Sequence, residues 1–230
     1  MTDGDPVAAS GAGSFVAELE PLLDLIESSP VSLTSIRSRS DAIDSHLRDS
    51  LSGLEVPQLT EAERVVDIGS GAGFPGLPLA LALPATSFTL IDSVARKAEF
   101  IGDAAEALGL KNVMALALRS EEFASGAGRE AFDCAIARAV APLSALAELA
   151  SPLLREGGSL VAWKGDREVD EEAKLSEINS KLAMELSDVI EVVPFPGSRP
   201  RNLYVITKDG PTPEGLPRRP GMARKRPLSA

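Results

Sequence analysis

The stretch from residue 65 to residue 76 constrains this chain more than any other part and reads VVDIGSGAGFPG. A β-branched run ends at Asp67, and Gly69, Gly71 and Gly73 follow at alternate positions. Glycine lets the backbone adopt positive φ and lets a ligand approach without a Cβ in the way. A strand, a glycine-rich turn and a helix N-terminus in this order predict a site for a nucleotide-type cofactor.

Two classes of cofactor fit this stretch. Gly71, Gly73 and Gly76 match the G-x-G-x-x-G fingerprint of nicotinamide enzymes. However, the glycines begin directly after the strand, and no second domain is large enough to hold a hydride acceptor. The spacing D-x-G-x-G-x-G from Asp67 instead resembles motif I of the class I S-adenosylmethionine-dependent methyltransferases. That resemblance implies a cofactor-binding set of Asp67, Gly69, Gly71, Gly73 and Phe74.

From Arg64 onward, strand patterns alternate with helix patterns, which predicts an α/β fold with a mostly parallel sheet covered on both faces. We expect strands near 64–69, 87–92, 112–118, 132–138, 157–163, 189–195 and 201–207, and helices near 75–83, 94–109, 141–154 and 168–187. Only a short Pro/Gly link separates the last two strands, which therefore form an antiparallel edge hairpin. The expected fold is the Rossmann-like, seven-stranded class I methyltransferase fold, with additional N-terminal helices.

Composition changes along the chain and predicts four segments. Residues 1–14 are expected to be disordered, and residues 15–60 to be helical with interruptions at Pro21 and Pro30. Residues 61–210 form the cofactor-binding domain, and residues 211–230 are a basic tail without regular structure.

The charge of the chain is unevenly distributed. The net charge is −11, but residues 199–230 hold eight basic and two acidic residues, so this end carries +6 and the other 198 residues −17. Such asymmetry predicts an anion-binding edge, although a solvated tail is equally compatible with it.

The lone Cys134 cannot form an internal disulfide, and no apolar run is long enough to span a membrane. We expect a soluble, cytoplasmic monomer that uses no metal ion.

Two acidic positions complete the expected cofactor site. Asp92 ends the second strand, where a carboxylate accepts hydrogen bonds from ribose hydroxyls. The alternative for Asp92 is to cap the helix at 94–109. Ser120 and Glu121 follow the third strand, where such folds contact adenine, although they are equally able to begin a helix.

A more specific resemblance extends over residues 33–228. The sequence DIGSGAGFPGLPLA from Asp67 resembles the glycine motif of the bacterial 16S rRNA guanine-N7 methyltransferases, also called the glucose-inhibited division protein B family. Further similarity lies at Leu33-Thr34 with His46 and the run from Asp49, at 90–100, at 119–121, at 137–139, and at 217–228. Ser32 replaces the family's usual asparagine. The resemblance implies S-adenosylmethionine as cofactor and 16S rRNA of the small ribosomal subunit as substrate.

The resemblance also implies roles outside the cofactor motif. Arg138 ends the fourth strand and is expected to contact the cofactor's methionine carboxylate or the O6 and N7 of the guanine, with an ion pair to Asp67 or Glu121 as the alternative. His46 is expected either to pack in the domain or to lie on the substrate side. Cys134 lies inside an apolar strand and is expected to pack as a small hydrophobe, with the nucleophile of a pyrimidine C5 methyltransferase as the alternative. Methylation at N7 itself needs no general base. The expected RNA contacts are Lys164, Arg199, Arg201, Arg218, Arg219, Lys225 and Arg226.

Overall fold

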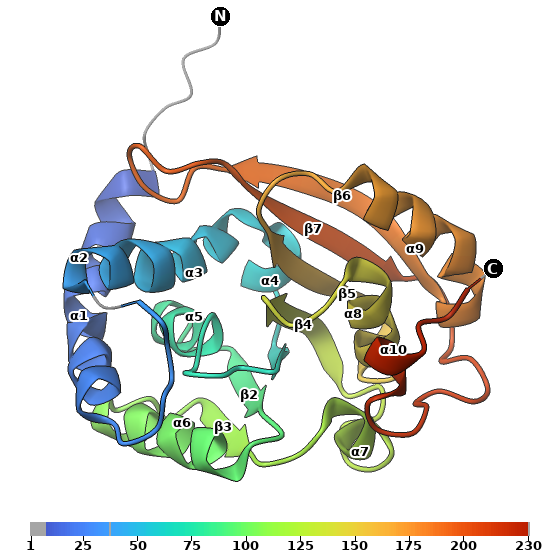
Figure 1. Ribbon diagram of the computed structural model, residues 1–230, viewed down its shortest axis with the longest axis horizontal. Helices are drawn as coiled ribbons and strands as arrows, with labels where there is room; N and C mark the ends of the chain where they lie inside the picture. The colour runs from blue at the N-terminus through green and yellow to red at the C-terminus, as the bar shows by residue number, and fades with distance from the viewer. Residues whose placement is uncertain (1–7, 37, 230) are drawn as a thin grey trace, which may run out of the picture.

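The chain folds around one seven-stranded sheet, as shown by a computed structural model that describes residues 8–36 and 38–229 (Figure 1). The strand order is β3-β2-β1-β4-β5-β7-β6. Strands β1 to β5 are parallel, and β7 is antiparallel to both β5 and β6. The expected fold class and edge hairpin are therefore confirmed. The strands are β1 (Arg64–Ile68), β2 (Ser87–Ile91), β3 (Val113–Leu116), β4 (Phe132–Arg138), β5 (Leu154–Lys164), β6 (Met184–Val192) and β7 (Arg201–Lys208).

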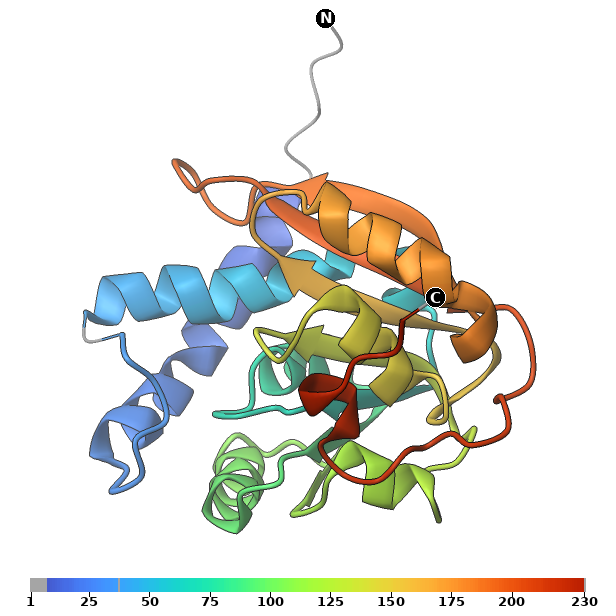
Figure 2. The same ribbon diagram turned by 45° about the vertical axis from the view of Figure 1, so that its right-hand side comes forward.

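Helices cover both faces of the sheet (Figures 1 and 2). One face carries α1 (Ala8–Ser28), α2 (Arg39–Ala42), the π-helical turn η1 (Ile43–Arg48), α3 (Asp49–Leu51), the 3₁₀ turn η2 (Ser52–Glu55), α4 (Pro57–Thr60), α5 (Gly76–Ala82) and α6 (Ala95–Ala107). The other carries α7 (Ser120–Ala124), α8 (Leu143–Ala150), α9 (Val169–Leu182) and α10 (Met222–Lys225). Within the described ranges, no helix has the length and apolar character needed to cross a membrane.

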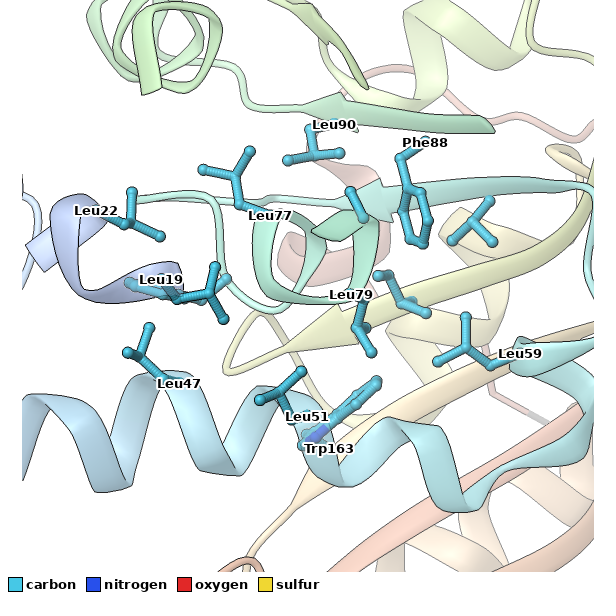
Figure 3. Close-up of a cluster of buried hydrophobic side chains, with 14 of the residues drawn as sticks. Leu19, Leu22, Leu47, Leu51, Leu59, Leu77, Leu79, Phe88, Leu90 and Trp163 are labelled. Atoms are coloured by element: carbon cyan, nitrogen blue, oxygen red, sulfur yellow. The ribbon is translucent and has the colours of Figure 1, made fainter. Parts of the chain in front are cut away.

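Alternating residues along each strand divide the core into two layers, as the two-residue period of a strand requires. In β1, Val65 belongs to the layer beneath α1 and α5, whereas Val66 belongs to the layer beneath α8 and α9. Figure 3 shows the first layer, in which Leu51 of the N-terminal segment lies beside Trp163 of β5 and Leu47 lies near Leu19 of α1. The N-terminal segment is therefore part of the main core.

The N-terminal segment is more regular than its sequence predicts. Helix α1 begins at Ala8 and continues through Pro21, so the expectations of disorder over 8–14 and of an interruption at Pro21 are wrong; residues 1–7 lie outside the described residues. Proline removes one backbone donor from the helix. Burial of Leu19, Leu22 and Leu23 against the domain offsets that loss.

Two expectations for the C-terminal part are also wrong. The helix expected over 168–187 ends at Leu182, because Ala183 adopts φ +51° and β6 already begins at Met184. The alternating apolar residues at the start of β6 continue the apparent helical face of α9, which hides the boundary in the sequence. The tail expected to lack regular structure contains α10, whose Ala223 is buried against α8.

Candidate cofactor site and adjoining cavity

The glycine-rich turn lies at the carboxyl edge of the parallel strands, where ligands bind in this class of sheet. Gly69, Gly71 and Gly73 all have positive φ, as the sequence predicts. The Gly69 amide donates to the Ile91 carbonyl at 2.8 Å, which fixes the turn against the end of β2. A Cβ on Gly71 would meet no atom closer than 3.9 Å, so the Gly71 backbone faces open space that a ligand can enter.

Asp67 lies beneath this turn and is fully buried. Its Oδ2 accepts a hydrogen bond from the Gly76 amide at 3.0 Å, at the start of α5. Its Oδ1 has no hydrogen-bond partner among the residues that the structure describes. Burial is the largest effect on this carboxyl and raises its pKa to about 7. A buried, unsatisfied acceptor beside an open glycine turn fits a site completed by a polar, cationic cofactor.

Asp92 directly follows β2 and stabilises the glycine-rich turn. Its Oδ2 accepts from the Gly71 amide at 3.0 Å, and its Oδ1 accepts from the Val94 amide at 2.8 Å. The second bond closes a local turn of two residues and does not cap α6, whose N-cap is Val94 with no side-chain cap hydrogen bond, so the expected alternative for Asp92 is wrong. Asp92 also lines a cavity of about 290 Å³ together with Gly69, Ser93, Ser120 and Glu121. The cavity has the dimensions and polar lining needed for the nucleoside part of S-adenosylmethionine.

The C-terminal tail forms one wall of this cavity, through Gly221, Ala223 and Arg224. The Gly221 amide donates to Oε1 of Glu121 at 2.6 Å, so that carboxylate anchors the tail at the expected adenine position. Helix α7 does begin at Ser120, as its alternative interpretation predicts. Figure 2 shows the tail running past α7 and α8. The sequence carries no signal for this wall, because contact between residues 121 and 221 depends on tertiary structure.

A second cavity, of about 400 Å³, adjoins the first at Ala139, which lines both. Arg138 lines the second cavity and donates through Nη1 to Asp49 Oδ2 at 2.9 Å and to the Ser45 carbonyl at 3.0 Å. Its guanidinium also lies over the ring of Phe74, 5.4 Å from the centroid. The expected alternative ion pair of Arg138 with Asp67 or Glu121 is therefore wrong, and the partner is Asp49 on the N-terminal segment.

His46 stacks on Phe74 with ring centroids 4.6 Å apart, and its Nε2 is 2.7 Å from Thr34 Oγ1. Burial and the nearby Arg138 lower its pKa to about 4. The imidazole is therefore neutral at pH 7. Cys134 is buried in β4, where burial raises the pKa of its thiol, in agreement with a packing role.

We expect His46 to make the stability of the protein depend on pH. Its pKa is lower in the folded state than in the unfolded state, so the unfolded chain binds more protons between pH 4 and about 6.5. Stability contributed by this group is therefore lost as the pH falls through that range. Urea denaturation at pH 5 and pH 7 measures it. The His46→Gln variant should lose less stability at pH 5 than the wild type, because His46 is the only histidine. An identical pH dependence would contradict the prediction.

The expected RNA-contacting cations occupy different environments. Lys164 Nζ pairs with Glu171 Oε2 at 2.8 Å, and Arg201 Nε pairs with Asp49 Oδ1 at 2.9 Å. Arg218 forms a bidentate pair with Glu148. The remaining four lie at the surface, on the β6–β7 loop and on the tail: Arg199, Arg219, Lys225 and Arg226. Sequence reasoning did not identify Asp49 or Arg224 as site residues.

The comparisons with known proteins agree with this site. The family model described as "GidB: rRNA small subunit methyltransferase G" matches residues 19–195. A ribosomal RNA small subunit methyltransferase G from Chloroflexus aggregans is 42% identical, with 98% of this chain and 93% of the relative covered. The protein of the same name from Gloeobacter violaceus is 40% identical over 87% of this chain and 80% of the relative.

Solved structures agree on the fold. A "SAM dependent methyltransferase from Aquifex aeolicus" aligns with a TM-score of 0.53 at 20% identity, covering 70% of this chain and 90% of that one. "P. horikoshii TYW2 in complex with MeSAdo" aligns with a TM-score of 0.54 at 13% identity, covering 72% and 64%. Both agree with the fold described above. The family match shows that the nicotinamide assignment is wrong. The chain belongs to the GidB family of rRNA small subunit methyltransferases and depends on S-adenosylmethionine.

Proposed function

We propose that this protein methylates N7 of a guanine in 16S rRNA of the small ribosomal subunit. The observation that carries the proposal is the pair of cavities that meet at Ala139, in a chain of this family. The first cavity suits the cofactor, and the second provides room for a target base beside it. A ribosomal substrate also favours a cytoplasmic location.

The chemistry at N7 suits the residues around the second cavity. S-adenosylmethionine, when bound, supplies an electrophilic methyl group on its sulfonium. Ring N7 has a free lone pair at neutral pH, so no general base is required and no proton has to move. The site can therefore act by holding the reacting groups in line, which contributes effective molarities of about 10⁵ M or more.

The proposed cofactor contacts are Asp67, Gly69, Gly71, Gly73, Phe74, Asp92, Ser120, Glu121 and Arg138. For Arg138 we restrict the role further. A fork onto O6 and N7 would occupy the lone pair that has to attack the methyl group, and Nη1 is already bonded within the protein. Nη2 lies 3.4 Å from His46 Nδ1, so the N–H groups left for a ligand are the second one on Nη2 and the one on Nε. Through these, Arg138 contacts either guanine O6 or the methionine carboxylate. Its loss should lower the methylation rate or the cofactor affinity.

The proposed RNA contacts are the exposed cations on the tail and the β6–β7 loop, with Lys164 and Arg201 at the second cavity. Lys164, Arg201 and Arg218 each already pair with a carboxylate, and Arg218 differs from the other two because it does not line the second cavity and its partner Glu148 is almost fully buried. In A-form RNA the N7 atom lies in a deep, narrow groove, so the target guanine has to be unpaired or extruded.

The decisive experiment combines labelled S-adenosylmethionine, the purified protein and small ribosomal subunits that lack the modification, followed by nucleoside mass spectrometry. We expect 7-methylguanosine to appear only when the protein is present. Label in a different nucleoside would contradict the N7 assignment. Label only in a metabolite extract would indicate a small-molecule methyltransferase instead.

A further inference from the structure

Asp49 joins two arginines that are distant in the sequence. One carboxylate oxygen binds Arg138 at the end of β4, and the other binds Arg201 at the start of β7, each at 2.9 Å. The Asp49 side chain is only 6% exposed. Its backbone carbonyl accepts the indole N–H of Trp163 at 3.0 Å, which fixes the helix on the sheet. The carboxylate is therefore held rigidly between the two guanidinium groups.

The two arginines are not equally available to a ligand. Arg138 is only 14% exposed and already bonds to Asp49 and the Ser45 carbonyl. Arg201 is 34% exposed and uses its Nε for Asp49. No hydrogen bond to the Nη atoms of Arg201 is present within the described residues. Because Arg201 lines the second cavity, these two nitrogen atoms are free to bind an anion there.

We infer that Asp49 is a positioning residue that aims Arg201 at a phosphate of the target nucleotide. This inference rests on the proposed function, because it assumes that the second cavity receives RNA. Fixing the guanidinium through Nε leaves its Nη edge for a bidentate phosphate contact, which is the geometry that arginine favours. The N-terminal segment thus contributes to substrate binding through a residue that need not touch the substrate.

The sign of the expected effect separates this role from simple electrostatics. Asp49→Asn removes a negative charge, which by itself should strengthen the binding of RNA. If Asp49 aims Arg201, the variant should instead bind small ribosomal subunits about tenfold more weakly, as expected for one charge-assisted hydrogen bond. Asp44→Asn is the matched control, because it removes the same charge from the same segment, where Asp44 pairs at the surface with Arg48.

A double-mutant cycle tests whether Asp49 affects RNA binding through Arg201. We would measure equilibrium binding of small ribosomal subunits to Asp49→Asn, Arg201→Gln and the double variant, across a range of salt concentrations. Arg201→Gln should weaken binding about tenfold and reduce the salt slope by about one unit, as for the loss of one phosphate contact. The double variant should bind no more weakly than Arg201→Gln alone, because the two residues act together.

Three results would overturn the inference: additive losses in the cycle, binding by Asp49→Asn as tight as that of Asp44→Asn, or a salt slope unchanged by Arg201→Gln. If Asp49→Asn does not fold, the Arg201→Gln variant still tests the inference. Binding of small ribosomal subunits as tight as that of the wild type would exclude a phosphate contact by Arg201. Failure of the proposed function is distinguished by the wild-type protein, which would then bind subunits without forming 7-methylguanosine.

Discussion

Replacing Arg218 by alanine is expected to lower the free energy of unfolding by about 3 kcal/mol, because it leaves Glu148 as an unpaired, buried charge. The Glu148 side chain is only 4% exposed, and both of its oxygens bind Arg218, at 2.7 and 2.6 Å. Urea denaturation measures this loss. The loss of stability is limited to this size because the tail can detach and let water reach Glu148. We therefore also expect faster amide hydrogen exchange over residues 216–229.

The same substitution should weaken S-adenosylmethionine binding at least about tenfold, a difference of about 1.4 kcal/mol measurable by calorimetry. The tail that Arg218 holds forms a wall of the cofactor cavity through Gly221 and Arg224. Arg219→Ala is the control, because it removes an equal charge at the next position, where the side chain is exposed. We expect Arg219→Ala to leave both stability and cofactor affinity unchanged. Equal effects of the two variants would show that the ion pair between Arg218 and Glu148 does not hold the tail at the cofactor cavity.

Gly73→Ala is expected to cost about 3 kcal/mol of stability and to abolish measurable cofactor binding. Gly73 has φ +90°, which costs an L-residue about 1–2 kcal/mol. The new Cβ would also lie 2.7 Å from Cγ of Leu77, a fully buried side chain, so the glycine turn has to shift. Denaturant unfolding and calorimetric titration with S-adenosylmethionine measure the two effects.

Gly102→Ala provides the control of opposite sign for Gly73→Ala. Gly102 lies exposed in the interior of α6, and a Cβ there would meet no atom within 4 Å. Alanine at such a position should raise stability by about 0.5–1 kcal/mol and leave cofactor binding unchanged. If Gly73→Ala behaves like Gly102→Ala, the strained turn is not required for the cofactor site.

The sequence by itself determined the sheet and the position of the cofactor site. Strand periodicity, the glycine spacing after Asp67 and the carboxylate at Asp92 are local features, so they could be interpreted without knowing the fold. Boundaries were less certain where apolar residues fit either a helix or a strand, as at Met184, where the left-handed Ala183 ends the helix.

Only the tertiary structure decided what the charged residues of the site bind. Arg138 pairs with Asp49, Glu121 holds Gly221, and Arg218 is neutralised by Glu148, across 70 to 100 positions of sequence. Ion pairs and hydrogen bonds of this kind depend on distances between elements that are far apart in the sequence and come together only in the folded chain. A sequence motif fixes the conformation of its own turn, whereas the packing of the N-terminal segment and the tail against the sheet fixes the two walls of the site.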